Sequence, residues 1–111
     1  MLLMKSNRTS NACATKLAGL ADPTRLAVVE VLLAGPRKVK EINQRLGVAQ
    51  NLLSHHLRVL RDAHLVTSCR DGKGVTYALA HGVEMGPSRN AINLGCCSLT
   101  FRKPQGGSKT L

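Results

Sequence analysis

The stretch GVAQNLLSHHLRVL, Gly47–Leu60, places two adjacent histidines in a pattern typical of a helix. On a helical wheel of about 100° per residue, counted from Gln50, its side chains separate into two arcs. His56 falls in the middle of the apolar arc, whereas His55 lies at the edge of the polar arc. We therefore expect His56 to be packed, with a local partner for its ring nitrogen, because a buried polar group without a hydrogen bond is costly.

The polar arc of this helix carries short hydrogen-bonding side chains where a solvated surface more often carries Glu and Lys. Amide, hydroxyl and imidazole groups suit the edges of bases, and arginines suit phosphates. This contrast predicts that the polar arc binds duplex nucleic acid. The polar arc comprises Gln50, Asn51, Ser54, His55, Arg58, Arg61 and Asp62. The apolar arc comprises Leu52, Leu53, His56, Leu57, Val59, Leu60 and Ala63.

The sequence before this helix predicts a second, shorter helix. In RKVKEINQRLG, the apolar residues Val39, Ile42 and Leu46 fall at helical spacing, and Gly47 ends the helix. Only a tight turn separates it from the helix described above. Two short helices joined in this way are typical of a helix-turn-helix, whose second helix is the recognition helix.

A hairpin is predicted directly after the recognition helix. LVTSCR and VTYALA are rich in β-branched residues and flank DGKG, which is a strong signal for a tight turn. A hairpin in this position is a wing. Arg70 and Lys73, near its tip, are expected to reach the phosphates or the minor groove of neighbouring DNA.

Upstream, DPTRLAVVEVLLAG carries signals for both ends of a helix, with Asp22 as cap, Pro23 in the first turn and Gly35 as stop. Its interior is apolar nearly all round, which predicts a central buried helix. A shorter helix is expected before it, over residues 12–21. The side chains of that helix expected to face inward are Leu17, Leu20 and Ala21.

The composition fits a small DNA-binding domain. A chain of 111 residues forms one domain, small enough that a partner subunit would help to bury its surface. Its 16 Lys and Arg outnumber its 6 Asp and Glu, which gives a formal charge of +10 and favours nucleic acid as a partner. Aromatic residues make up only 2%, which disfavours the stacking of single-stranded bases.

Neither a membrane span of about 18 apolar residues nor a secretory signal is found in the sequence. We therefore expect a cytoplasmic protein whose four cysteines are free thiols at rest.

The chain is expected to divide into four parts. These are a flexible segment over residues 1–11, a DNA-binding domain over 12–80, a dimerisation and sensor segment over 81–101, and a flexible basic tail over 102–111. Within the third part, glycines and Pro87 leave room for at most a short helix around 88–94. After it, the alternation of Cys97, Leu99 and Phe101 with Cys96, Ser98 and Thr100 predicts a strand.

Together these motifs resemble the ArsR/SmtB family of winged-helix metalloregulators over Leu17–Ala80. The matching stretches are LADPTRLAVVEVLL, INQRLGVAQNLLSHHLRVLRDAHLV and DGKGVTYAL. The resemblance implies a mainly α fold with a β-hairpin wing, a winged helix-turn-helix that acts as a homodimer. It also implies a repressor that binds a palindromic double-stranded operator and leaves it when an inducer binds. The residues it places on bases are Gln50, Asn51, Ser54 and His55, and those it places on the DNA backbone are Arg58, Arg70 and Lys73.

The inducer sites known in the family do not match this sequence. The helix KVKEINQRL lacks the thiol pair of many relatives, and only His81 and Glu84 stand where others bind zinc with Asp and His. The remaining signal is the adjacent pair Cys96 and Cys97. The family's dimer interface, formed by the first helix and the C-terminal segment, would bring Cys13 near this pair, within one subunit or between two. Three thiolates would bind arsenic(III), antimony(III) or another thiophilic ion as inducer.

Other uses of the cysteines stay open. Cys97 can pack inward with Leu99 and Phe101 while Cys96 remains an idle surface thiol, or the same sulfurs can sense oxidants. Cys69, in the first wing strand, is interpreted as structural.

The two alternatives to a sensor are an enzyme and an architectural DNA-binding protein. The spacings of an arsenate reductase, a disulfide reductase or a phosphate-binding loop are not present in the sequence, so we expect no enzyme and no required cofactor. An architectural DNA-binding protein without a ligand is the remaining alternative, and ligand-dependent release of DNA distinguishes it from a sensor.

His64, at the end of the recognition helix, is interpreted as a cap.

Overall fold

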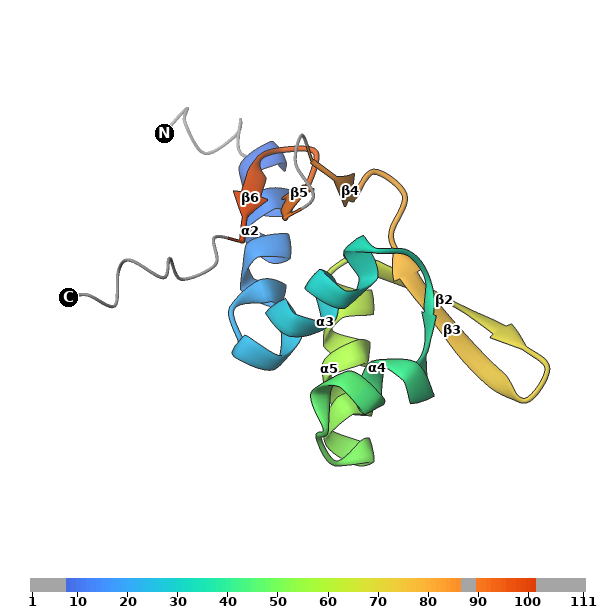
Figure 1. Cartoon of the computed structure of the whole chain (residues 1–111). Helices are drawn as coiled ribbons and strands as arrows, with labels where there is room; N and C mark the ends of the chain where they lie inside the picture. The colour runs from blue at the N-terminus through green and yellow to red at the C-terminus, as the bar shows by residue number, and fades with distance from the viewer. Residues whose placement is uncertain (1–7, 87–89, 102–111) are drawn as a thin grey trace, which may run out of the picture.

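Helix α3 (Pro23–Leu33) is the centre of the computed structural model, which describes residues 8–86 and 90–101 (Figure 1). Its buried side chains belong to a core cluster shared with α5 and the strands. The Asp22 carboxylate accepts hydrogen bonds from the backbone N–H groups of Thr24 at 2.9 Å and Arg25 at 3.1 Å. The predicted central helix and its cap are confirmed.

Helices α4 (Val39–Leu46) and α5 (Gln50–Asp62) form the predicted helix-turn-helix. Gly47 ends α4 with a φ of +66°, a conformation that glycine adopts without steric cost, and its N–H donates to the Asn43 carbonyl at 2.7 Å. The Asn43 side-chain oxygen then accepts the N–H of Val48 at 3.0 Å. One asparagine thus fixes the tight turn between the two helices.

The first two residues of the helix predicted in RKVKEINQRLG form a strand instead. Strand β1 (Arg37–Lys38) pairs antiparallel with β3 (Gly74–Leu79), where its residues lie opposite Tyr77 and Thr76. Pairing with the free edge of β3 satisfies backbone groups that another helical turn would leave exposed. Helix α4 begins directly afterwards, where Glu41 Oε1 accepts the backbone N–H of Lys38 at 2.8 Å.

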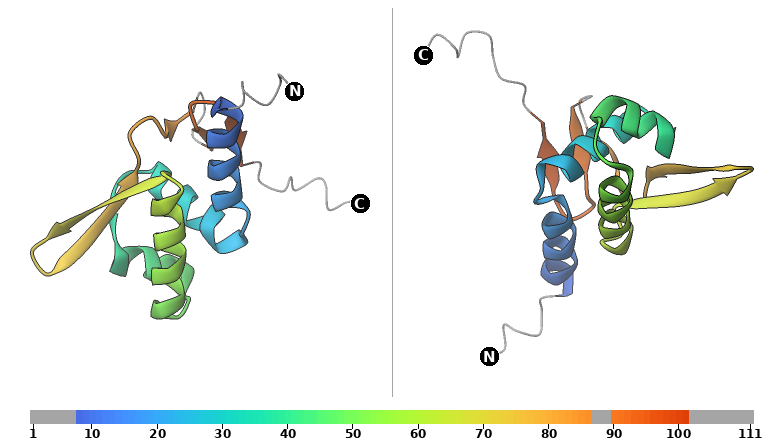
Figure 2. Two further views of the ribbon diagram at one scale, coloured as in Figure 1. Left: turned by 180° about the vertical axis from the view of Figure 1, so that it is seen from behind. Right: turned by 90° about the horizontal axis from the view of Figure 1, so that it is seen from below.

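The predicted wing is confirmed as the hairpin of β2 (Val66–Asp71) and β3. Asp71 lies opposite Gly74, so that Gly72 and Lys73 form the turn, and Gly72 has a φ of +64°. The sheet has the strand order β1-β3-β2. Figures 1 and 2 show the hairpin extending away from the helices as an arm.

Helix α5 passes to the wing through His64, whose φ is +64°. The N–H of His64 donates to the Arg61 carbonyl at 3.0 Å, and that of Leu65 donates to the Leu60 carbonyl at 2.9 Å. These two bonds form a Schellman motif. The capping role predicted for His64 is confirmed, and it comes from the backbone of the residue.

The segment after the wing folds as a second antiparallel sheet, in the order β4 (Glu84–Met85), β5 (Ala91–Asn93) and β6 (Ser98–Thr100). The prediction of a short helix around 88–94 is wrong for the described residues of this range, because Ala91 and Ile92 are buried in a paired strand. The predicted strand in CCSLTF is confirmed as β6. Cys97, Leu99 and Phe101 pack against the core, while Cys96, Ser98 and Thr100 are exposed.

Helix α2 (Arg8–Leu20) begins before the helix predicted over 12–21, so the expected flexible segment 1–11 is helical from Arg8 onward. Residues 1–7 and the expected tail 102–111 lie outside the described residues. Leu20 is buried as predicted, but Leu17 is 43% exposed and Ala21 is exposed, contrary to the prediction. The reason is that α2 packs with the face that carries Cys13, Lys16 and Leu20, and Leu17 lies at the edge of that face. None of the described helices is long and apolar enough to cross a membrane.

Candidate nucleic-acid interface and sulfur cluster

The recognition helix and the wing present every residue that the sequence placed on DNA. All of these side chains are exposed, namely Gln50, Asn51, Ser54, His55, Arg58, Arg70 and Lys73. The opposite face of α5 buries Leu53, His56, Leu57 and Leu60. The exposed arc is wider than the sequence predicted, because Leu52, assigned to the apolar arc, is 45% exposed.

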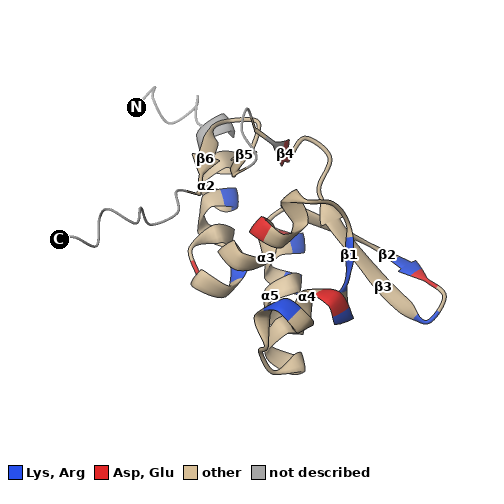
Figure 3. Cartoon of the chain, viewed as in Figure 1, with Lys and Arg blue, Asp and Glu red and all other residues tan. Residues whose placement is uncertain are grey.

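A groove of about 1000 Å³ separates the recognition helix from the wing. Three lysines line it from three different elements, namely Lys38 from β1, Lys40 from α4 and Lys73 from the wing turn. Gln50 and Ser54 of α5 line the same groove. Figure 3 shows basic residues on β1, α4, α5 and the wing. The groove therefore places ammonium groups beside hydrogen-bonding side chains, which suits a phosphate backbone with its base edges.

One of these lysines gains its position from strand pairing that the sequence pattern did not reveal. Lys38 lies in the groove because β1 joins the edge of β3, and its Cδ comes close to Gly74 at the end of the wing turn. In sequence, the basic residues Arg37, Lys38 and Lys40 are typical of a solvated face, although they stand where a helix-turn-helix crosses phosphates.

The two histidines of α5 differ as predicted, since His56 is 7% exposed and His55 is exposed. The Nδ1 atom of His56 lies 3.2 Å from Nη1 of Arg25 and 3.9 Å from Oδ2 of Asp22. A guanidinium can only donate, so Nδ1 is the acceptor in this hydrogen bond, which requires the tautomer with its proton on Nε2. The hydrogen bond from the backbone N–H of Arg25 is the main cause that lowers the pKa of Asp22 below its ordinary value.

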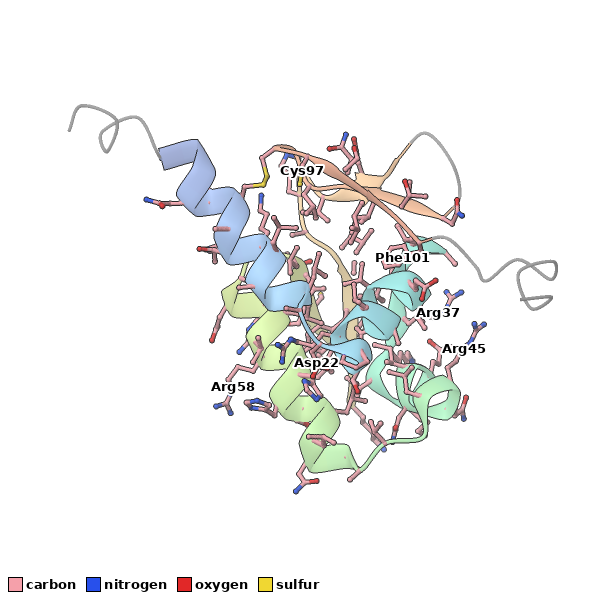
Figure 4. The ribbon with its side chains drawn as sticks, turned by 90° about the vertical axis from the view of Figure 1, so that its left-hand side faces the viewer. Asp22, Arg37, Arg45, Arg58, Cys97 and Phe101 are labelled. Atoms are coloured by element: carbon pink, nitrogen blue, oxygen red, sulfur yellow. A yellow bond between two sulfur atoms is a disulfide. The ribbon has the colours of Figure 1, made fainter. Side chains whose placement is uncertain are left out.

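Cys13, Cys96 and Cys97 meet beside α2. Their Sγ atoms lie within 4.8 Å of one another, and over residues 8–86 and 90–101 no other three side chains form such a potential metal-binding group. Cys13 and Cys96 form a disulfide with a Cα–Cα distance of 5.9 Å. Cys97 Sγ lies 3.5 Å from Cys13 Sγ and 3.9 Å from Cys96 Sγ (Figure 4).

The disulfide corrects the expectation that all four cysteines are free, because only Cys69 and Cys97 lie outside it. The cause is the tertiary packing of α2 beside the C-terminal sheet, where Lys16 Nζ donates to the Leu94 carbonyl at 3.2 Å. This packing brings together two sulfurs that are 83 positions apart in the sequence. The three cysteines meet within one subunit, and Cys96 is not an idle thiol.

The other potential ligands lie apart from this cluster. Cys69 lies outside the cluster, which agrees with its interpretation as structural and not as a ligand, but it is exposed on β2 and does not pack in the core. His81 and Glu84 are exposed, and neither belongs to a group of three potential ligands among the residues that the structure describes.

Sequence patterns did not single out Arg25 or Lys16. Arg25 stands three positions after the capping residue Asp22, which predicts its backbone contact but not the partners of its guanidinium. Those partners, the Gly19 carbonyl and His56 Nδ1, depend on how three helices pack. Lys16, one helical turn after Cys13, was a weak signal for a cation near the sulfurs.

Comparison with known proteins gives consistent similarities. A family model described as bacterial regulatory protein, arsR family, matches residues 22–68. The chain is 40% identical over 87 residues to a probable mercury resistance operon repressor of Streptomyces lividans, covering 71% of this chain and 70% of that protein. It is 39% identical over 66 residues to the HTH-type transcriptional regulator NmtR of Mycobacterium tuberculosis, covering 60% of this chain and 55% of that protein.

Among solved structures, the chain is similar to the homodimeric winged helix-turn-helix DNA-binding domain of a Mycobacterium bovis protein. The TM-score is 0.61 and the identity 28%, over 64% of this chain and 66% of that one. The chain spans about half the length of the first curated relatives that it matches. The predicted winged helix-turn-helix fold is confirmed.

Proposed function

This chain belongs to the arsR family of bacterial regulatory proteins, and we propose that it is a DNA-binding transcriptional repressor whose operator affinity is set by Cys13, Cys96 and Cys97. The observation that carries the proposal is the combination of the lysine-lined groove beside α5 with the sulfur cluster beside α2. We assign DNA binding to residues 12–80, and sensing to residues 81–101 together with α2. Catalysis is not part of the proposal, because the family is one of regulatory proteins.

The proposed DNA interface uses the exposed residues of α5 and the wing in two ways. Gln50, Asn51, Ser54 and His55 contact base edges, and Arg58, Arg70 and Lys73 contact phosphates. The exposure of all these residues and the position of Lys73 opposite Gln50 and Ser54 support this division. A contact to a base edge discriminates between sequences, whereas a phosphate contact does not.

The test is a comparison of two variants on two DNAs, a palindromic fragment selected by the protein from a random library and an unrelated duplex. Ser54→Ala should lose about 1–3 kcal/mol on the selected fragment and little on the unrelated duplex. Lys73→Ala should weaken both alike and reduce the slope of affinity against salt. Equal losses on both DNAs for Ser54→Ala would remove the assignment of α5 to base reading.

The proposed inducer is a thiophilic ion such as arsenic(III) or antimony(III), bound by the three sulfurs once the disulfide is reduced. Cys97 Sγ lies 3.5 and 3.9 Å from the other two sulfurs, and each of these pairs would subtend about 100–115° at an ion that forms bonds of about 2.3 Å. The third pair, Cys13 and Cys96, has to separate when the disulfide is reduced. Thiolates are also the ligands that soft ions prefer. The mercury repressor relative supports a soft ion as the class of inducer.

Direct binding can be measured by counting the thiols of reduced protein that react with a chromogenic disulfide reagent. Arsenite should block the three clustered thiols and leave Cys69 reactive. In Cys13→Ser the number of blocked thiols should fall and the affinity for arsenite should drop. Blocking that is unchanged in Cys13→Ser would show that α2 takes no part in the site.

A second candidate function, redox sensing by the same sulfurs, is favoured by the Cys13–Cys96 disulfide. In that reaction the two thiols lose two electrons and two protons to an oxidant such as a peroxide, which is reduced to water. Release of DNA by peroxide and not by arsenite, with both effects tested on reduced protein, would favour this function over ion sensing.

We further propose that the protein acts as a homodimer joined through α2 and the C-terminal segment. Leu17 leaves a large apolar side chain 43% exposed on α2, and the similar Mycobacterium bovis domain is homodimeric. A dimer also matches the two half-sites of a palindromic operator.

A further inference from the structure

The side chain of Arg25 joins two helices that have different parts in the proposed function. Its Nε donates to the carbonyl oxygen of Gly19, in the last turn of α2, at 2.6 Å. Its Nη1 donates to Nδ1 of His56, in α5, at 3.2 Å. Because the guanidinium is rigid and planar, these two contacts have a fixed relative geometry. One side chain thus connects the helix that carries Cys13 to the recognition helix.

The α2 end of this connection is tightly packed. A Cβ atom on Gly19 would lie 2.8 Å from the Cβ of Ala63 and 3.0 Å from Cδ1 of Leu65, so the α2 backbone rests directly on the end of α5. Cys13 precedes Gly19 by roughly 9 Å along the helix axis. Cys13 lies near the middle of α2, and Figure 4 shows the disulfide there and Asp22 beyond the C-terminal end of the helix. A displacement of α2 at the sulfurs therefore reaches the Gly19 carbonyl, because a helix moves as a rigid element.

The α5 end of the connection is buried. His56 is 7% exposed, and its Nδ1 depends on Arg25 for its hydrogen bond, with the Asp22 carboxylate as the other charged group nearby at 3.9 Å. Loss of the Arg25 contact would leave a buried acceptor without a donor, which is unfavourable. The adjacent residues Ser54 and His55 are exposed on the proposed DNA surface. A change at His56 thus acts on the buried face of the helix whose opposite face is proposed to contact bases.

We propose that Arg25 is the positioning residue through which the state of the sulfur cluster changes the DNA affinity of α5. This inference rests on the proposed function, since it names the route by which that regulation travels. The two states of the cluster place α2 differently, and Arg25 carries the difference to His56. Arg25 itself contacts neither the inducer nor DNA.

The experiment compares operator affinity of reduced protein without arsenite and at saturating arsenite, in the wild type and two variants. The wild type should lose about tenfold or more in affinity, within the usual range of allosteric coupling. Arg25→Lys keeps the charge but cannot hydrogen-bond to both partners. Arsenite should therefore lower the operator affinity of this variant by less than about twofold, while it still blocks the same thiols. Arg45→Lys, on the exposed surface of α4, is the matched control and should respond like the wild type.

The quantity compared is the ratio of operator affinities without and with arsenite. If this ratio is the same in Arg25→Lys as in the wild type, the role of Arg25 is overturned and the proposed function is left intact. A wild type that does not respond to arsenite or peroxide would overturn both. If Arg25→Lys does not fold, two variants of its partner decide the question. His56→Asn retains an acceptor at the position of Nδ1 and should keep the ratio, whereas His56→Leu should lose it. Equal ratios in these two variants would contradict the proposal.

Discussion

Two adjacent residues, His55 and His56, differ because the helix turns by about 100° between them. One faces solvent with the proposed base-contacting residues, and the other lies 7% exposed beside Arg25 and Asp22. The helical pattern alone predicted this division. It could not predict which group would satisfy the ring of His56, because Arg25 comes from a helix 31 positions earlier.

At Asp22, stability should depend on pH in a defined direction. The pKa of the carboxyl group is lowered in the folded state, chiefly by the backbone N–H of Arg25. The ionised form is therefore stabilised by folding, so its contribution is fully present above the unfolded pKa and is lost as pH falls through the folded pKa. Thermal melts at pH 7 and pH 3 should show a larger destabilisation by Asp22→Ala at pH 7. A difference between wild type and variant that does not shrink at pH 3 would contradict this origin of the cap's stability.

His64 should be a site where glycine is stabilising. A left-handed backbone costs an ordinary residue about 1–2 kcal/mol, and glycine adds flexibility to the unfolded chain that offsets part of the gain. We expect His64→Gly to raise the free energy of unfolding by about 0.5–1 kcal/mol, as measured by urea denaturation. His64→Ala, which keeps the strain, serves as the control, and a gain of the same size in that variant would refute the explanation.

Among the elements, those with local signals were predicted correctly, including β6 through its alternation, whereas β1, β4 and β5, which depend on distant pairing, were not. Helix α3 has its own cap, α4 its own glycine stop, and the wing its own Asp-Gly turn. Strand β1, by contrast, exists only because β3 offers a free edge. The C-terminal sheet likewise depends on pairing of short strands, and glycines and a proline obscure it in the sequence.

The candidate sites divide in the same way. The exposed residues of α5 and the wing followed from periodicity and turn position. The meeting of Cys13 with Cys96 and Cys97 followed from resemblance to a family, since no local pattern links them. The disulfide and the bridging role of Arg25 required tertiary packing that no sequence pattern specifies.

The contact between α2 and the end of α5 should be intolerant of one added methyl group. Gly19→Ala normally favours a helix, but here the new Cβ would meet the Cβ of Ala63 at 2.8 Å, and neither atom can rotate away. Overpacking of this kind costs about 1–3 kcal/mol, so the variant should unfold at lower denaturant. Ala18→Gly, at the exposed neighbouring position, gives the pure helix-propensity effect for comparison. A more stable Gly19→Ala would show that the two helices are not in such close contact.

For the whole molecule, the exposed apolar side chain on α2 and the formal charge of +10 point to two different partners, a second subunit and DNA. Sedimentation at micromolar concentration should give a mass near twice the 11.9 kDa of one chain. Leu17→Glu should shift the protein toward the monomer, because it places a charge in the proposed apolar interface. A single species of 11.9 kDa for the wild type, with and without DNA, would refute the dimer.

The central claim is that the sulfur cluster controls DNA binding. The most direct measurement is a titration of the reduced protein, bound to its selected palindromic DNA, with arsenite. The wild type and Cys69→Ser, which changes an exposed thiol outside the cluster, should both release the DNA with a loss of about tenfold or more in affinity. The Cys96→Ser/Cys97→Ser variant should bind the DNA with wild-type affinity and keep it at the same arsenite concentration. Equal release in all three proteins, or release in none, would contradict the claim.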